Sequence, residues 1–194
     1  MSNKVPKIRF KGFTEDWEEY ELGKIGDTYT GLSGKTKEDF GRGKGKYVTY
    51  MNVFANPVAS LEQLDKIEID KNQKEVIKGD VFFTTSSETP DEVGLSSVWI
   101  YDQKDVYLNS FCFGYRPKFE IDSYYLAYLL RSSSIRKEIT FLAQGISRYN
   151  ISKTKVMEIN IPIASKKEQI KIGEYFKTLD NLINNHQNKY NKLI

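Results

Sequence analysis

Residues 165–194 place apolar side chains at alternating intervals of four and three, which restricts this segment to a helix that pairs along one face. Ser165-Lys166-Lys167-Glu168 has the form of a capping box, so we expect the helix to begin there. The expected seam of helix-packing positions comprises Ile172, Phe176, Leu179, Ile183, His186, Tyr190 and Leu193.

Two arrangements of this helix are open. It could lie on its own domain as an amphipathic helix, or it could project as a coiled-coil arm. The run NNHQNKYN at 184–191 has too little apolar surface to be buried on a globule, which favours the arm. We interpret His186, which is the single histidine, as a polar contact that sets helix register rather than as a catalytic or metal-binding group.

The preceding part of the chain, 1–164, is predicted to be an irregular, mostly antiparallel β domain with a few short helices, and therefore α+β. Runs of β-branched and aromatic residues predict strands, and helices are expected where a serine or aspartate can cap them. The expected strands are 47–54, 80–86, 95–101, 106–117 and 155–164, with a hairpin turn at 102–105, and the expected helices are 123–133 and 135–144.

Composition narrows the class of protein. Hydrophobic residues make up 39% of the 194, enough for a packed core, and the net charge is only +3, so a nucleic-acid site would need local clustering of charge. A single cysteine, Cys112, rules out a disulfide framework within the chain. We find neither a signal peptide nor an apolar run long enough to span a membrane, and we expect a soluble, cytoplasmic protein.

The stretch GLSGKTKEDFGRGKGKY at 31–47 contains Gly34-Lys35-Thr36, the end of a nucleotide-binding P-loop. The first glycine of that motif falls on Tyr29, so the motif fails. The alternative to a solvated loop is a segment that holds DNA phosphates, with glycines that allow close approach and cations that displace counterions. The expected phosphate-binding residues are Lys35, Thr36, Lys37, Arg42, Lys44 and Lys46.

Three further segments have the composition of base-reading loops: 49–52, 85–92 and 144–150. Arginine suits guanine and asparagine suits adenine, because each makes two parallel hydrogen bonds to a base edge. The alternatives are an ordinary turn at 86–89 and a core role for Tyr149. The expected DNA-binding residues of these segments are Tyr50, Asn52, Ser86, Ser87, Glu88, Thr89, Arg148, Tyr149 and Asn150.

We identify no catalytic residue, no metal site and no bound cofactor. Pro90-Asp91 followed by Asp102-Gln103-Lys104 imitates a PD…DxK nuclease site, but the second part reads as a turn rather than a buried strand. A methyltransferase would need a glycine-rich cofactor loop and an Asn/Asp-Pro-Pro-Tyr/Phe motif, which the sequence lacks. A nuclease using Asp91, Asp102 and Lys104, or an interaction protein that pairs only through its helix, remain the rival interpretations.

The order of these parts resembles one half of a type I restriction-modification specificity subunit. The resemblance is carried by WEEYELGKIGDTYTG at 17–31, VIKGDVFFTTS at 76–86 and, most specifically, GISRYNISKTKVMEINIPIASKKEQIKIGEYFKTLDNLI at 145–183. It covers essentially the whole chain.

The resemblance implies a function without chemistry of its own. Such subunits use two target-recognition domains to read a bipartite double-stranded DNA site, and two long helices set the spacing between its halves. They dock methyltransferase subunits, which bind S-adenosylmethionine, and a restriction subunit, which uses ATP. This chain has one domain and one helix, so we expect either a truncated subunit or a half that pairs with a copy of itself.

Overall fold

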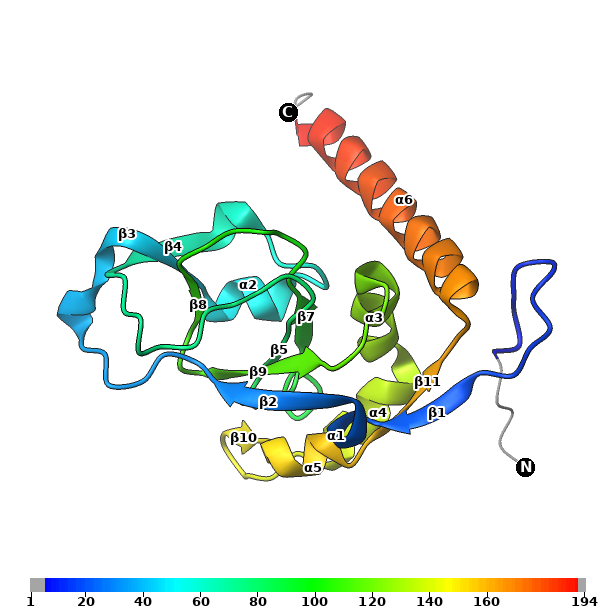
Figure 1. Ribbon diagram of the computed structural model, residues 1–194, viewed down its shortest axis with the longest axis horizontal. Coiled ribbons are helices and arrows are strands. Elements are labelled where there is room, and N and C mark those ends of the chain that lie inside the picture. The colour runs from blue at the N-terminus through cyan, green and yellow to red at the C-terminus, as the bar shows by residue number, and fades with distance from the viewer. Residues whose placement is uncertain (1–5, 192–194) are drawn as a thin grey trace.

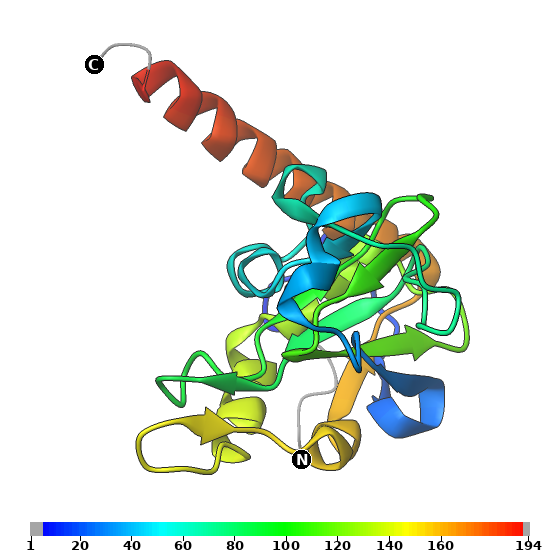
Figure 2. The same ribbon diagram turned by 90° about the vertical axis from the view of Figure 1, so that its left-hand side faces the viewer.

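A long helix, α6 (Lys166–Asn191), rises from one side of a mixed body of strands and short helices (Figure 1). The computed structural model describes residues 6–191. Seen from two directions, the far half of α6 stands clear of the body (Figure 1 and Figure 2). The predicted α+β fold with short helices and a long C-terminal helix is confirmed.

A four-stranded antiparallel sheet forms the centre of the body, and its strands come from the apolar runs of the sequence. Its two middle strands are bridged by a stacked aromatic pair, with the rings of Phe83 and Phe113 5.1 Å apart between centroids. In spatial order the strands are β2 (Gly26–Thr30), β9 (Cys112–Pro117), β5 (Val81–Thr84) and β7 (Ser96–Val98).

A second sheet has three strands, in the order β4 (Leu64–Ile67), β3 (Phe40–Val48) and β8 (Val106–Leu108). β8 runs parallel to β3, whereas β7 pairs with β5 in the central sheet. The predicted hairpin at 102–105 is therefore wrong. This segment crosses from one sheet to the other because β8 is fully buried and completes the edge of β3.

Two predicted strands are partly helical, each for a local reason. The 47–54 strand ends at Val48, because the Thr49 side chain accepts a hydrogen bond from Asn52 N and caps the helix α2 (Tyr50–Ala55). The 155–164 strand is shortened because the hydroxyl of Ser152 accepts from Lys155 N and starts α5 (Lys153–Met157). A threonine or serine cap overrides the β-propensity of the residues that follow it.

The largest apolar core lies where helices pack against the central sheet. Leu126 and Leu130 on one helix and Ile139 on the next are fully or almost fully buried there, with Val81 and Phe83 from β5. The elements that surround this core are α1 (Leu22–Ile25), α3 (Ser123–Leu130), α4 (Ser133–Phe141) and a two-stranded antiparallel ribbon of β1 (Glu18–Glu21) and β11 (Asn160–Ile163).

The first half of α6 packs closely on α3. Gly173 permits this approach, because a Cβ there would lie 2.3 Å from Oδ1 of Asp122. One turn further, the rings of Phe176 and Tyr128 stack with centroids 4.6 Å apart. The side chain of Gln169 accepts from Asp122 N at 2.9 Å, which fixes the start of α6 to the start of α3.

The predicted capping role of Glu168 is wrong. Its carboxylate is 1% exposed and instead receives Arg9 Nη2 at 2.7 Å and Trp17 Nε1 at 2.9 Å. Burial by itself would raise the pKa of Glu168, but the hydrogen bonds from Arg9 and Trp17 keep that pKa below its usual range. Glu168 thus ties the N-terminal segment to α6.

The predicted seam divides into two parts. Ile172, Phe176 and Leu179 are half-buried against the body, whereas Ile183 and Tyr190 are 54% and 65% exposed. His186 is also exposed, and Leu193 lies outside the described residues. The far half of the seam is therefore an apolar stripe that the described chain leaves uncovered, as a projecting arm requires.

Candidate nucleic-acid interface

Two of the three predicted reading segments meet in a short antiparallel ribbon formed by β6 (Ser86–Ser87) and β10 (Tyr149–Asn150). Thr85 O, just before β6, accepts from Ile151 N at 3.0 Å. The hydroxyl of Ser86 accepts from Nε of Arg148 at 3.3 Å. Figure 2 faces the end of the body that carries β10 and β3.

The third predicted segment reaches the same place through one side chain. The hydroxyl of Tyr50, at the start of α2, donates to Ser86 O at 2.8 Å. The backbone around Thr85 and Ser86 is thus the point at which 49–52, 85–92 and 144–150 are joined. We call Thr85-Ser86 the hub.

The predicted DNA-binding residues of these segments differ in their exposure to solvent. Glu88, Thr89, Arg148 and Asn150 are exposed, and Tyr149 is half-buried against the main core. In contrast, Ser86 and Ser87 are 6% and 7% exposed, and Ser87 Oγ already donates to Glu92 at 3.0 Å. The exposed residues are the ones available to a ligand.

Asn52 has a structural role. Asn52 is fully buried. Its side-chain nitrogen Nδ2 donates to Ser60 O at 2.7 Å, and its Oδ1 accepts from Ser60 N at 2.8 Å. This asparagine holds the connection after α2 in place, so its base-reading edge is already occupied. Asn52 is therefore left out of the DNA-contacting set proposed below.

The glycine-rich basic stretch at 31–47 is not one continuous loop, because its second part is a strand. Thr36 and Asp39 form a reciprocal cap over a single 3-10 turn, and β3 then begins at Phe40. Its register shifts between Phe40 and Gly45. Gly43 has φ +91°, and a Cβ there would lie 2.5 Å from Ile67 O, so this glycine serves close approach to β4 and not to a phosphate.

The basic residues of this stretch are not equivalent. Lys35 Nζ lies 2.7 Å from Oδ2 of Asp70 and its side chain is only 13% exposed. The hydrogen bond from Lys35 lowers the pKa of Asp70 to about 2, and bonds from Asn72 and Gln73 contribute. The cations that point to solvent are Lys37, Arg42, Lys44 and Lys46.

Two half-buried arginines, Arg131 at the end of α3 and Arg136 within α4, hold the predicted reading segments in place. Arg131 donates to the carbonyl oxygens of Ser96, Val53, Phe54 and Asn56 at 2.7–3.1 Å, and so fastens the end of α2 to β7. Burial lowers the pKa of Arg131 to about 10.

Arg136 does the same for the loop that follows β6. It donates to the carbonyl oxygens of Asp91, Val93 and Gly94 at 2.7–2.8 Å. Sequence reasoning missed both arginines, because a long charged residue in a helix is ordinarily solvent-exposed and the sequence carries no sign that these two bind carbonyl groups of distant segments.

A turn that the sequence analysis assigned to the interior of a strand also touches the hub. Phe111 O, between β8 and β9, accepts from Thr85 N at 3.1 Å and from Thr85 Oγ1 at 2.8 Å. The segment was missed because Asn109-Ser110 is a weak turn signal inside a long apolar run. Asn and Ser are turn residues, and here they end β8.

The structure shows where Cys112 and the nuclease-like pair of the sequence lie. Burial raises the pKa of the Cys112 thiol to about 12, so its thiolate is scarce at neutral pH. Asp102 and Lys104 are exposed in the connection between β7 and β8, which gives no support to a nuclease site on a buried strand.

Among residues 6–191 there is no cluster of three His, Cys, Asp or Glu side chains that could hold a metal ion. No helix within that range is long and apolar enough to cross a membrane.

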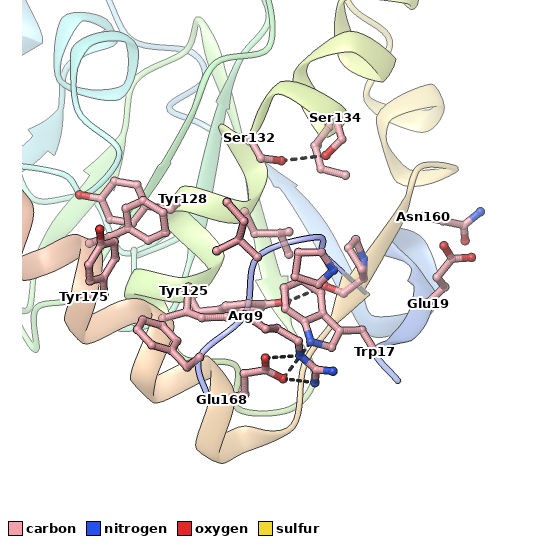
Figure 3. Close-up of a pocket in the computed structure, with 18 of the residues that line it drawn as sticks. Arg9, Trp17, Glu19, Tyr125, Tyr128, Ser132, Ser134, Asn160, Glu168 and Tyr175 are labelled. Carbon is pink, nitrogen blue, oxygen red and sulfur yellow. Dashed lines mark hydrogen bonds and ion pairs between the residues drawn. The ribbon is translucent and has the colours of Figure 1, made fainter. Parts of the chain in front are cut away.

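A groove of about 760 Å³ lies apart from this interface, between α6, α3, α4 and the N-terminal segment (Figure 3). Its walls are mainly apolar and aromatic, with Tyr128, Tyr175 and Phe176 at the α6 side. The Arg9–Glu168–Trp17 contact lies along it.

Comparisons with known proteins agree with this arrangement. The family model described as type I restriction modification DNA specificity domain matches residues 14–193, so the chain belongs to that family. It is 28% identical over 179 residues to a putative type I restriction enzyme specificity subunit, MjaX, of Methanocaldococcus jannaschii. The alignment covers 87% of this chain and 40% of that relative, so the chain spans less than half its length.

Solved structures share the fold at low sequence identity. The S subunit of a type I restriction-modification system from M. genitalium is 18% identical, with a TM-score of 0.60 over 95% of this chain and 43% of that one. A chain from a structure on complex assembly and conformational transition of the type I restriction-modification system is 16% identical, with a TM-score of 0.64 over 94% of this chain and 43% of that one.

We predict that Arg131→Met will destabilise the protein by roughly 2–4 kcal/mol, because four carbonyl groups lose their shared donor. Urea unfolding measures the loss. Amide exchange in 50–56 should also accelerate by more than the global change, since Arg131 fastens that segment. Arg42→Met, which removes an exposed arginine, is the matched control. An unfolding midpoint equal to the wild type would show that Arg131 is not an anchor.

Proposed function

We propose that the chain reads one half of a bipartite double-stranded DNA target as the recognition part of a type I restriction-modification specificity subunit. The observation that carries this proposal is the meeting of three polar segments at the hub, in a fold that belongs to the DNA specificity domain family. Segments that are far apart in the sequence meet at the hub and carry the exposed side chains of Thr89, Arg148 and Asn150. The share of the relatives that the chain spans, 40–43%, suits one half-site reader.

The proposed contacts fall into two classes. Phosphate contacts, which position the protein without reading sequence, come from Lys37, Arg42, Lys44 and Lys46, with Lys35 and Thr36 in supporting roles. Base contacts come from the exposed residues at the hub, of which Arg148 and Asn150 are residue types that can make paired hydrogen bonds to guanine and adenine. Glu88 and Thr89 lie on the adjoining loop, and Tyr50 acts through its bond to Ser86.

We propose that residues 1–164 form the reading unit and residues 165–194 the pairing unit. The chemistry would lie in other subunits: methyltransferase subunits that bind S-adenosylmethionine, and a restriction subunit that uses ATP. The chain itself would hold no cofactor and carry out no reaction.

The pairing unit has two surfaces for a second specificity half or a copy of the chain. One is the exposed stripe of Ile183 and Tyr190, with Leu182 beside it, at 50–65% exposure. The other is the aromatic groove at the base of α6, which Ile172 and Phe176 of the predicted seam help to line. A helix laid along both would bury side chains that are otherwise in contact with water.

The central experiment maps adenine methylation in cells that express this chain as one half of a complete specificity subunit together with its methyltransferase. We expect Arg148→Ala or Asn150→Ala to weaken cognate binding by about 1–3 kcal/mol and to relax preference at a single base pair. Thr154→Ala, an exposed position on α5, is the control. Methylation patterns that do not change when the chain is replaced by another recognition half would refute the proposal.

Salt dependence tests the phosphate contacts. The triple variant Lys37→Ala, Arg42→Ala and Lys44→Ala should lower the slope of log affinity against log salt by up to about 3, equally on all sequences. Adding Lys35→Ala should lower it by less than one further unit, because Lys35 is already neutralised by Asp70. The readout is binding of the assembled complex across a salt series. A slope that stays at the wild-type value would mean that these lysines and arginine face away from DNA.

Helix pairing is tested on the exposed stripe. Ile183→Glu with Tyr190→Glu should abolish association with a second specificity half while leaving the unfolding midpoint of the chain nearly unchanged, since both side chains are more than half exposed. Asn181→Glu with Asn188→Glu adds the same charge about 160° and 140° away from Ile183 around the helix and is the matched control. Sedimentation or co-purification gives the result. Normal association of the stripe variant would show that α6 pairs through another face.

A further inference from the structure

The turn between β8 and β9 has a backbone fixed by buried polar contacts. Asn109 is 5% exposed; its Oδ1 accepts from Phe111 N at 2.8 Å and its Nδ2 donates to Val48 O at 3.0 Å. Phe111 O receives both the amide and the hydroxyl of Thr85. Both backbone hydrogen-bonding groups of Phe111 are therefore committed, one to its own turn and one to the hub.

The side chain on this fixed backbone points outward. Phe111 is 60% exposed, although its neighbours Leu108, Cys112 and Phe113 are at most 3% exposed. Single exposed apolar residues are common on proteins and by themselves need no explanation. This one differs because its backbone is bonded to Thr85, one residue from the serine that contacts Tyr50 and Arg148.

The chemistry around Phe111 restricts what it could touch. The hub and the residues beside it carry hydroxyl, amide and guanidinium groups, which suit the polar edges of bases. Phe111 adds a phenyl ring on a backbone that is fixed by hydrogen bonds. In the major groove the group that offers an apolar contact is the 5-methyl of thymine, and phenylalanine is among the side chains that meet it. Because its backbone is already fixed, this residue loses less conformational freedom on binding than one on a mobile loop.

We propose that Phe111 is a specificity-determining residue that contacts the 5-methyl group of a thymine in the DNA half-site. The inference rests on the proposed function, since it assigns a further contact to the same interface. It names a position that lies outside the three segments recognised in the sequence.

The test removes the methyl group from the DNA and the ring from the protein. The complete specificity subunit, assembled with its methyltransferase, is bound to duplexes in which each half-site thymine, on either strand, is replaced in turn by deoxyuridine. We expect one replacement to weaken wild-type binding by about fourfold, the effect of burying one methyl-sized group. Phe111→Ala should weaken binding to the thymine duplex at least as much and should abolish the effect of that one replacement.

Two further variants sharpen the result. Phe111→Leu keeps an apolar side chain and should retain part of the discrimination. Phe119→Ala removes another exposed phenylalanine, which lies beyond the far end of β9 against Tyr20, and should retain all of it. The unfolding midpoint of Phe111→Ala should match the wild type because the ring is mostly exposed, so a loss of binding would not reflect misfolding.

The outcomes separate this inference from the proposed function. Two outcomes would overturn the contact and leave the half-site reading intact. In one, the wild-type protein binds sequence-specifically but no deoxyuridine replacement changes its affinity. In the other, Phe111→Ala keeps the full wild-type pattern. A ring inserted between base pairs would give sensitivity to base stacking in place of sensitivity to the methyl group, and would also overturn it. Absence of any sequence preference in the wild-type complex would instead overturn the proposed function.

Discussion

Buried carbonyl groups are the constraint on which the rest of this structure depends. The strands are short and the segments between them are irregular, so many backbone groups cannot be paired within a sheet. Side chains take over this work: the half-buried Arg131 and Arg136 bind seven carbonyl oxygens between them, and the buried Asn52 and Asn109 complete two connections. Because a buried carbonyl without a donor costs roughly 1–3 kcal/mol, these side chains determine where the loops lie.

The same anchors explain how an irregular domain can present a defined surface. A reader of DNA needs contacts held to within a fraction of an ångström, yet the recognition segments are loops. Here Arg131 fixes α2, Arg136 fixes the loop after β6, and Thr85 binds Phe111 and Ile151. The exposed residues at the hub are thus carried by a framework that the inward-facing side chains hold in place.

The long helix combines two environments in one continuous element. Its first half is joined to the body by Glu168, Gln169 and Gly173, so these contacts determine the direction of the arm. Its second half carries an uncovered apolar stripe. A partner that binds this stripe would therefore be placed at a fixed orientation relative to the proposed DNA interface, which is the property that a spacing device between two half-sites requires.

The sequence by itself determined the elements whose signal is local. The 4-3 spacing predicts α6, the β-branched runs predict the central strands, and the Arg148-Tyr149-Asn150 to Glu168-Gln169 segment carries the family resemblance. Only the tertiary structure decided which segments meet. Ser86 and Arg148 are 62 residues apart, and their contact depends on sheet pairing between distant strands. Likewise, no local pattern distinguishes the buried Asn52 from the exposed Asn150, or the half-buried Arg131 from the exposed Arg42. Burial of a polar side chain depends on whether distant backbone groups need its hydrogen bonds, and that is decided by how the whole chain packs.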